Sequence, residues 1–280
     1  MTAPSAELRI GIAITTLNRR EMVCAQIAEI RRLTRCAFDL VICDDGSSDG
    51  TPEAVRAMDE VILPGVNHGT AWNKNRGIFY LMAVCGCDIV ILLDDDMLPT
   101  EPDWQARWVQ AATRFGHVNF IYPTMLADLR DTDCTAENPG LTSSLLGCCM
   151  AFHRYAWNMV GYMDARFGKY GHEHTEFTNR FLRNGFGGIR REANGQTEHY
   201  YYVIGGGIRL LYAAPHGTPA EISAYATANA AIWEDIERRA EHTFRAPWHD
   251  NRQRLDFLAE MRLALRGYDI AIPAQSEAFQ

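Results

Sequence analysis

The sequence predicts an α/β protein built on a mostly parallel sheet, with helices on both faces and a helical extension after it. Short apolar runs alternate with helical patterns about four times in the first 120 residues, which is typical of consecutive strand–helix–strand units. Two of these runs end in clusters of acidic residues, and the composition changes to alanine-rich helical sequence from Pro219. We therefore expect residues 1–215 to form the sheet domain and residues 216–280 to form a C-terminal helical extension.

The first half of the chain supplies the clearest elements, each identified by its hydrophobic period. Residues 9–16 are rich in isoleucine, as in a strand buried on both faces. Val23, Ile27 and Ile30 repeat with the period of a helix. Pro52 suits the first turn of another. Strands are expected over residues 9–16, 38–43, 60–63, 88–93 and 118–122, and helices over 21–33, from 51, 70–84 and 104–115.

The second half is less regular. Residues 126–144 are polar and contain Asn138-Pro139-Gly140, so we expect a loop or flap beside the site. Further strands are expected over 145–152, 198–203 and 208–212, and helices over 173–183, 220–240 and 255–265. The last helix carries an apolar stripe that includes Leu258 and Met261. Core packing is the favoured role for these C-terminal helices. As alternatives, these helices would contact another subunit or line an acceptor groove.

Composition excludes several classes of protein. With 280 residues, of which 47% are hydrophobic, the chain can bury a substantial core. A net charge of -8 argues against general affinity for nucleic acids or anionic membranes. No signal peptide pattern is present, and no apolar run reaches the ~18 residues that would indicate a membrane span. The eight cysteines lack the paired spacing of zinc sites, which favours buried thiols in a reducing compartment and a cytoplasmic location.

The two acidic clusters carry the functional signal. Asp44 and Asp45 follow one apolar run, and Asp94, Asp95 and Asp96 follow another. In open α/β sheets, such strand ends lie in the crevice where ligands bind. Carboxylates packed this closely repel one another and need a compensating cation or polar ligand. We therefore expect a site for a nucleotide and a divalent metal.

Each cluster has a competing interpretation. The sequence after Asp44 also favours a tight turn, although a carboxylate at a strand end can accept the N3–H of uracil. Asp94 and Asp96 would project the same way if their strand continued, while Asp95 would point away. Such oxygen ligands suit Mn²⁺ or Mg²⁺. A solvated acidic loop is disfavoured for this second cluster because an apolar run precedes it.

Beyond these clusters, the order of motifs over roughly residues 8–205 resembles family 2 glycosyltransferases with the GT-A fold. The motifs are Thr15-Thr16-Leu17-Asn18-Arg19, residues 44–51 (DDGSSDGT), 73–77 (NKNRG), 94–96 (DDD), 147–154 (GCCMAFHR), 161–164 (GYMD) and 171–177 (GHEHTEF). The resemblance implies metal-dependent transfer of a sugar from a nucleoside-diphosphate sugar to an acceptor hydroxyl, with inversion and with a UDP-sugar favoured as donor.

The resemblance also implies roles for individual residues. Donor contacts fall to Thr15, Thr16, Asn18, Arg19, Asp44, Asp45, Lys74, Asp94 and Asp95. Asp94 and Asp96 would bind Mn²⁺ or Mg²⁺, with His199 as a third ligand and His216 or His242 as rivals. Lys74 stands where the family usually has arginine, and can still place a point charge near phosphate.

The segment with Glu173 and His174 departs from the family pattern. Inverting members usually carry Glu-Asp here, and that aspartate is the general base. A neutral imidazole can act as a base near pH 7, because its ordinary pKa is about 6.5. Either residue could be the base. Retaining transfer and an inactive nucleotide-sugar-binding module remain alternatives, while a nucleotidyltransferase is disfavoured because no phosphate-binding glycine-rich loop is present. The acceptor stays open among glycans, lipid-linked saccharides, proteins, small molecules and modified nucleic acids, and a homo-oligomer is possible.

Overall fold

The computed structural model describes residues 8–122, 129, 132–144, 146–192, 194–211, 218–239 and 244–274. The strands are β1 (Ile10–Thr16), β2 (Phe38–Asp44), β3 (Val61–Pro64), β4 (Ile89–Asp94), β5 (Met97–Pro99), β6 (His117–Phe120), β7 (Gly140–Thr142), β8 (Cys149–His153), β9 (Gly188–Arg191), β10 (Thr197–Ile204) and β11 (Ile208–Leu210). Of these, β5 and β11 form a separate two-stranded antiparallel sheet. The helices are α1 (Arg20–Leu33), α2 (Thr51–Arg56), α3 (Thr70–Phe79), η1 (Tyr80–Val84), α4 (Trp104–Phe115), α5 (Arg154–Val160), α6 (Glu173–Arg183), α7 (Pro219–Arg239), α8 (Asn251–Leu265) and η3 (Arg266–Tyr268).

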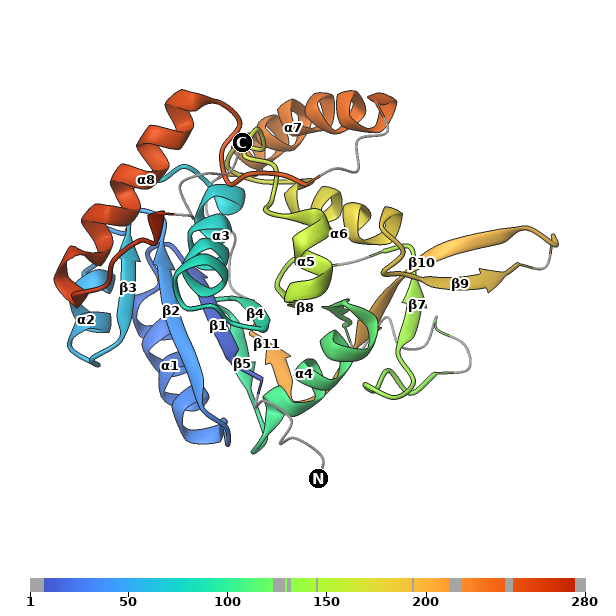
Figure 1. Cartoon of the computed structure of the whole chain (residues 1–280), viewed down its shortest axis with the longest axis horizontal. Helices are drawn as coiled ribbons and strands as arrows, with labels where there is room; N and C mark the ends of the chain where they lie inside the picture. The colour runs from blue at the N-terminus through green and yellow to red at the C-terminus, as the bar shows by residue number, and fades with distance from the viewer. Residues whose placement is uncertain are drawn as a thin grey trace.

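The central sheet confirms the predicted α/β class. Within the described residues the strand order is β3-β2-β1-β4-β8-β6-β10-β7, with β9 pairing β10 outside this path. The neighbours β3, β2, β1 and β4 run parallel (Figure 1). Strand β8 lies antiparallel between β4 and β6. Because the first four strands share a direction, their carboxyl ends meet at one edge of the sheet. Both acidic clusters follow strands of this group.

Alternating side chains of the parallel strands build two cores, one on each face of the sheet. On β1, Ile12 and Ile14 join the cluster that includes side chains of α1 and α4, whereas Ala13 joins the cluster with α3, α5, α6 and α8. All three side chains are fully buried. Strands covered on both faces read as continuous apolar runs, which is why this region was recognisable from sequence.

Helix α3 lies unusually close to the sheet. A Cβ atom built on Gly77 would stand 2.9 Å from the Cβ of Ala13 and 3.0 Å from the Sγ of Cys43. A larger residue would push the helix away from β1 and β2. The close approach brings the first turns of α3 against the carboxyl ends of these strands, and so fixes one wall of the crevice.

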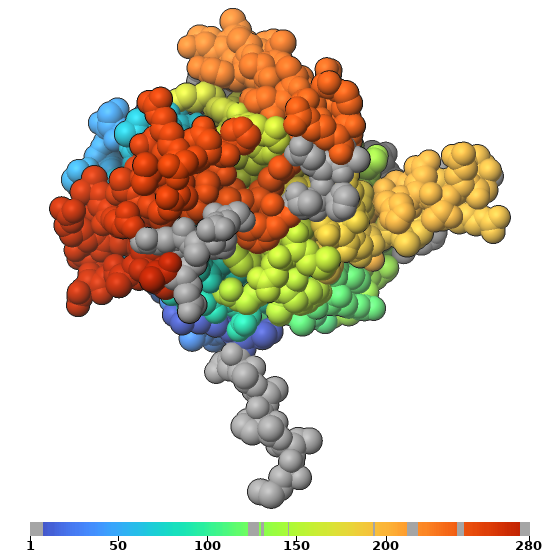
Figure 2. Space-filling view, turned by 45° about the horizontal axis from the view of Figure 1, so that its top comes forward, coloured from blue at the N-terminus to red at the C-terminus, as the bar shows by residue number. Residues whose placement is uncertain are grey.

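The two C-terminal helices cover one side of the molecule (Figure 2). Helix α8 buries Phe257, Leu258, Met261 and Leu265 in the core shared with α3, so the expected core packing is confirmed for this helix. Helix α7 buries only Asn229 and Ile236. No helix in the described part of the chain is long and apolar enough to cross a membrane. The domain boundary expected at residues 215–216 lies outside the described residues and stays a prediction.

Short elements account for most differences from the sequence expectations. β5, α5 and β9 were not predicted. Within the expected flap at 126–144, residues 126–128, 130 and 131 lie outside the described part, and β7 pairs with β10, so the flap is not all loop. The strand expected over 145–152 begins only at Cys149, and Leu145 is also outside the described residues. The hairpin β9–β10 projects from the body of the protein (Figure 1).

Candidate active site

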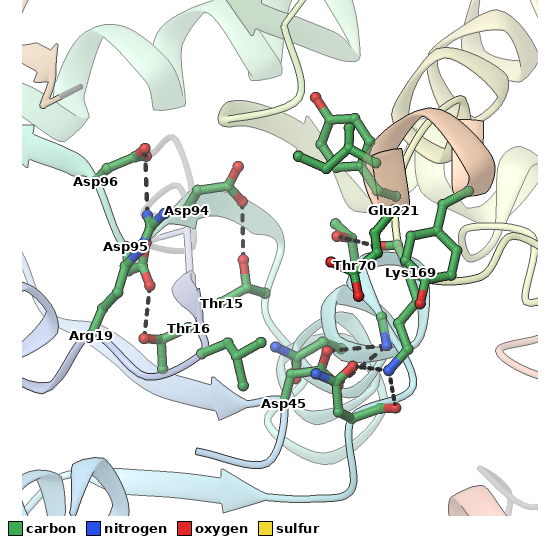
Figure 3. A pocket seen from close by; sticks show the side chains of 17 residues that line it. Thr15, Thr16, Arg19, Asp45, Thr70, Asp94, Asp95, Asp96, Lys169 and Glu221 are labelled. Carbon is green, nitrogen blue, oxygen red and sulfur yellow. Dashed lines mark hydrogen bonds and ion pairs between the residues drawn. The ribbon is translucent and has the colours of Figure 1, made fainter. Parts of the chain in front are cut away.

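A pocket of about 450 Å³ opens at the edge where β1, β2 and β4 end (Figure 3). The lining side chains are Thr15, Thr16, Leu17 and Arg19 after β1, Asp45 after β2, Asn67, Gly69, Thr70 and Asn73 around the start of α3, Asp94, Asp95 and Asp96 after β4, Lys169 and Tyr170 before α6, and Glu221, Ile222 and Tyr225 on α7. The structure therefore brings Asp45 of the first acidic cluster, but not Asp44, and all three aspartates of the second to one cavity, in the crevice where ligands bind in open α/β sheets.

The two aspartates of the first cluster have different partners. The Asp44 carboxylate accepts a hydrogen bond from the backbone N–H of Ser47 at 3.1 Å and closes a turn. The Asp45 carboxylate accepts from the backbone N–H groups of His68 at 2.9 Å and Gly69 at 3.0 Å. Burial raises the pKa of both aspartates, against the effect of these hydrogen bonds. Asp44 thus forms the tight turn that the sequence favours, and Asp45 lines the pocket, where its carboxylate can contact a ligand.

The second cluster is held by the end of β1. Thr15 Oγ1 donates to Asp94 Oδ1 at 3.0 Å, and Thr16 Oγ1 donates to Asp95 Oδ2 at 2.8 Å. Arg19 Nη1 donates to Asp95 Oδ1 at 2.7 Å. Asp95 would point away from the other two aspartates only if β4 continued through it, but all three aspartates line the pocket. The strand pairing ends at Asp94, and the chain turns before β5 instead of continuing the alternation.

Asp96 carries negative charge that the surrounding protein compensates poorly. Its Oδ2 lies 3.7 Å from Arg19 Nη1. Its Oδ1 is buried and has no hydrogen-bond partner within the described residues. Burial, and then the charges of Asp94 and Asp95, raise the pKa of Asp96 to about 6.

These carboxylates fit a hard divalent cation. Their oxygens are the ligands such ions prefer, and an orphaned buried oxygen of Asp96 is available for one. No group of three or more His, Cys, Asp or Glu side chains is arranged to hold a metal alone, as far as the described residues extend. A cation here would therefore complete its coordination with water or with oxygens of a bound ligand.

Lys74 is a buried cation behind the second cluster. Its Nζ lies 2.9 Å from Asp94 Oδ1 and donates to the carbonyl oxygen of Gly147 at 2.6 Å. The Lys74 side chain is only 2% exposed. Burial alone would lower the pKa of Lys74, but the charge of Asp94 and the hydrogen bond to it outweigh burial, so the pKa is raised. Lys74 therefore stays charged beside the pocket.

Asn18 joins two loops instead of lining the pocket. Its backbone N–H donates to Ser47 Oγ at 2.7 Å, and its Oδ1 accepts from the backbone N–H of Ser48 at 2.7 Å. The residue has a positive φ of 49°, which asparagine tolerates better than most side chains. Asn18 thereby fixes the loop after β1, which carries Arg19, to the turn after β2.

Glu173 and His174 begin α6 and form a pair next to Lys74. Glu173 Oε1 lies 3.2 Å from His174 Nδ1, and Glu173 is buried. Burial opposes ionisation of Glu173, but the hydrogen bond and charge of His174 and the charge of Lys74 outweigh it, so the pKa of Glu173 is lowered. The His174 ring packs on Gly147, where an added Cβ would stand 2.7 Å from its Cγ. This pair adjoins the pocket without lining it.

The structure does not bring His199 to the acidic cluster. His199 is exposed, lies on β10 and pairs with Ile189 in the projecting hairpin. It does not line the pocket. We therefore correct the expectation of a third metal ligand at this position, because the sheet topology carries it away from β4. His216 and His242 lie outside the described residues.

Sequence reasoning missed the wall that lies across the pocket from Asp94, Asp95 and Asp96 (Figure 3). Lys169 and Tyr170 come from the loop before α6, and Glu221 and Tyr225 come from α7. Lys169 Nζ donates to the carbonyl oxygen of Asn67 at 2.7 Å, which ties this wall to the loop before α3. The sequence offers one cue, a tyrosine within an alanine-rich helix, but no local pattern says which surface it faces.

Comparison with known proteins gives a consistent result. The family described as Glycosyl transferase family 2 matches residues 11–194. An uncharacterized glycosyltransferase of Acanthamoeba polyphaga mimivirus is 28% identical over 203 residues, which is 64% of this chain and 75% of the viral protein.

Solved structures extend the comparison to the fold. A mannosyltransferase from Pyrobaculum calidifontis, in complex with GDP-Man and Mn²⁺, has a TM-score of 0.58 at 16% identity, covering 98% of this chain and 79% of its own. Glucosyl-3-phosphoglycerate synthase from Mycobacterium tuberculosis, in complex with Mn²⁺, UDP and glucosyl-3-phosphoglycerate, has a TM-score of 0.53 at 18% identity, covering 83% of this chain and 80% of its own. These likenesses show that the chain has the GT-A fold.

Proposed function

The chain belongs to glycosyl transferase family 2, and we propose that this glycosyltransferase is metal-dependent and uses a UDP-sugar as its donor. The observation that carries the proposal is one pocket with two different polar ends. Asp45 stands at one end, where a carboxylate can accept the N–H of a base. Asp94, Asp95 and Asp96 stand at the other, together with the cationic Arg19. A nucleoside diphosphate has the matching polarity, with a hydrogen-bonding base and a charged diphosphate.

We propose that Asp94 and Asp96 would hold Mn²⁺ or Mg²⁺ at the diphosphate end. The orphaned Oδ1 of Asp96 supports this assignment. Since a cation of this class is commonly bound by one or two carboxylates plus phosphate oxygens, the small number of protein ligands is no obstacle. When bound, the cation supplies positive charge to the leaving diphosphate. Arg19 and Lys74 add fixed charge on the same side.

For the chemical step we propose a single displacement with inversion. The acceptor hydroxyl attacks the anomeric carbon, the bond from that carbon to the diphosphate oxygen breaks, and UDP leaves with the bonding electrons. His174 takes the acceptor proton. Glu173 accepts a hydrogen bond from His174 Nδ1, which orients the imidazole and leaves Nε2 as the proton acceptor. The lowered pKa of Glu173 makes that carboxylate the weaker base of the two.

We propose that the C-terminal helical extension forms part of the donor site. Glu221, Ile222 and Tyr225 of α7 line the pocket, although they lie beyond the expected boundary at residue 215. We keep the division into residues 1–215 and 216–280 as a proposal about the chain, with an extension that closes the donor pocket. The eight cysteines lack the paired spacing of zinc sites, which favours thiols in a reducing compartment, and we propose a cytoplasmic location on that ground.

Donor hydrolysis tests this function without knowledge of the acceptor. The purified protein is incubated with UDP-glucose, UDP-galactose, UDP-N-acetylglucosamine and GDP-mannose, with Mn²⁺ or with EDTA, and nucleotide release is measured. The proposal predicts slow release of UDP from one UDP-sugar, dependent on Mn²⁺ and lost in Asp96→Asn. Release of GDP alone would contradict the UDP assignment, and release unaffected by EDTA would contradict the metal. Retention of the configuration in the released sugar would contradict inversion.

A further inference from the structure

Glu260, on the C-terminal helix α8, reaches the loop and helix that follow β3. Its Oε1 lies 3.0 Å from His68 Nε2, and its Oε2 accepts a hydrogen bond from Trp72 Nε1 at 2.9 Å. The same Oε2 lies 4.0 Å from Arg76 Nη1. A carboxylate can only accept, so the contact with His68 places a proton on Nε2 of that ring. One side chain of α8 thus contacts three residues within nine positions of the chain.

Two of these partners, His68 and Arg76, donate hydrogen bonds to the aspartates of the first cluster. The backbone N–H groups of His68 and Gly69 hold the Asp45 carboxylate. Arg76 Nη2 donates to the carbonyl oxygen of Asp44 at 2.7 Å. Glu260 is therefore connected to Asp45 through His68 and to Asp44 through Arg76. It is also the one carboxylate of α8 with these contacts among the described residues.

The loop from His68 to Gly69 has little room on its other side. A Cβ built on Gly69 would stand 2.5 Å from Cα and 2.6 Å from the backbone nitrogen of Lys169. Lys169 therefore fixes one side of the loop, and Glu260 fixes the other through the His68 ring. The ring also packs at a tilt against Trp72, with ring centroids 4.7 Å apart and an interplanar angle of 43°.

Helix α8 does not need Glu260 in order to pack. Phe257, Leu258, Met261 and Leu265 already bury its apolar side in the core. Arg76, by contrast, is fully buried, and its Nε and Nη1 have no hydrogen-bond partner within the described residues. The negative charge of Glu260 therefore stabilises the His68–Arg76 segment and is not needed to hold α8 in place.

We propose that Glu260 is a positioning residue for nucleotide recognition, which acts by holding the backbone donors of His68 and Gly69 on the Asp45 carboxylate. The inference rests on the proposed function, because it assigns Asp45 to the base end of the donor. It also links the C-terminal helix to donor affinity. Loss of the Glu260–His68 contact should therefore weaken binding of a nucleotide that contacts Asp45. It should not weaken binding of a ligand that occupies only the diphosphate end.

The test compares two probes on the full chain, UDP and inorganic pyrophosphate, both titrated with Mn²⁺ by calorimetry. Glu260→Gln keeps the shape of the side chain but replaces one acceptor by an amide donor. We expect it to raise the Kd for UDP about ten-fold and to leave the Kd for pyrophosphate unchanged. His68→Ala is expected to weaken UDP binding similarly, and the double variant no further, because both changes break one contact.

Leu265→Ala is the matched control on the same helix. It removes a buried side chain of α8 that takes no part in the contacts of Glu260, so it is expected to lower the Tm while leaving the Kd for UDP unchanged. An unaltered Kd for UDP in Glu260→Gln would overturn the inference, and so would equal weakening of both probes. A wild-type protein that binds pyrophosphate but neither UDP nor GDP would instead overturn the proposed function, and the inference with it.

Discussion

Replacing Lys74 by methionine tests the electrostatics at the centre of the site. Methionine fills nearly the same volume, so the change removes the charge with little effect on packing. Breaking a buried ion pair by removing one partner costs about 3–5 kcal/mol. Asp94 is 33% exposed and can regain water, so we expect a loss of about 2–3 kcal/mol in the free energy of unfolding. The pKa of Lys74 is raised above its ordinary value of 10.5, hence its contribution is fully present below pH 10.5 and is lost as pH rises through the folded-state pKa.

Urea unfolding at pH 7 measures this loss, with an unchanged m-value showing that the compactness of the two states is preserved. Lys169→Met is the matched control, since that lysine donates to the carbonyl oxygen of Asn67 at 2.7 Å and is less buried. It is expected to cost less than about 1 kcal/mol. A loss below about 1 kcal/mol for Lys74→Met, or a gain in stability, would refute the view that Lys74 is the buried counter-charge of Asp94.

Three further predictions follow from other contacts. Burial lowers the pKa of His117 to about 3, so its contribution to stability is present above the unfolded-state pKa of about 6.5 and is lost as pH falls towards the folded-state pKa. Between pH 7 and pH 5 the wild type should lose about 2 kcal/mol in the free energy of unfolding, measured with urea, that His117→Phe keeps. Gly69→Ala should lower the Tm by forcing the loop off Lys169, because φ is 100° and a Cβ would meet backbone; an unchanged Tm would contradict the geometry. His174→Gln should reduce kcat about 10²–10⁴-fold with the Kd for UDP unchanged, and Glu173→Gln should reduce it less; a larger effect for Glu173→Gln would reverse the assignment of the base.

The parts of the structure that the sequence predicted are those governed by local pattern. β1 and β4 are continuous apolar runs because helices cover both faces of the sheet. Because β2 also runs parallel to β1, the positions of Asp45 after β2 and Asp94 at the end of β4 follow, since carboxyl ends of parallel strands share an edge. Fold class and the acidic residues at the two ends of the pocket therefore follow from local sequence pattern.

The parts that failed depend on where a strand stops or on packing between distant segments. The direction of Asp95 depends on whether β4 continues past Asp94, and a two-residue period does not predict the turn at which the strand ends. His199 lies on a projecting hairpin, and spacing along the chain cannot show that it leaves the body of the protein. Tyr225 lines the pocket and Glu260 reaches His68 through tertiary contacts of the C-terminal helices.

Thermal stabilisation by nucleotides tests the central claim most directly. The Tm is measured with UDP, GDP, CDP and dTDP, with and without Mn²⁺, for the wild type and for Asp96→Ala. A ligand that binds only the native state raises the Tm by mass action. We predict a shift with UDP that requires Mn²⁺ and is lost in the variant. No shift with any nucleotide, or a UDP shift that survives in Asp96→Ala, would contradict a metal-dependent nucleotide-sugar site at the end of β4.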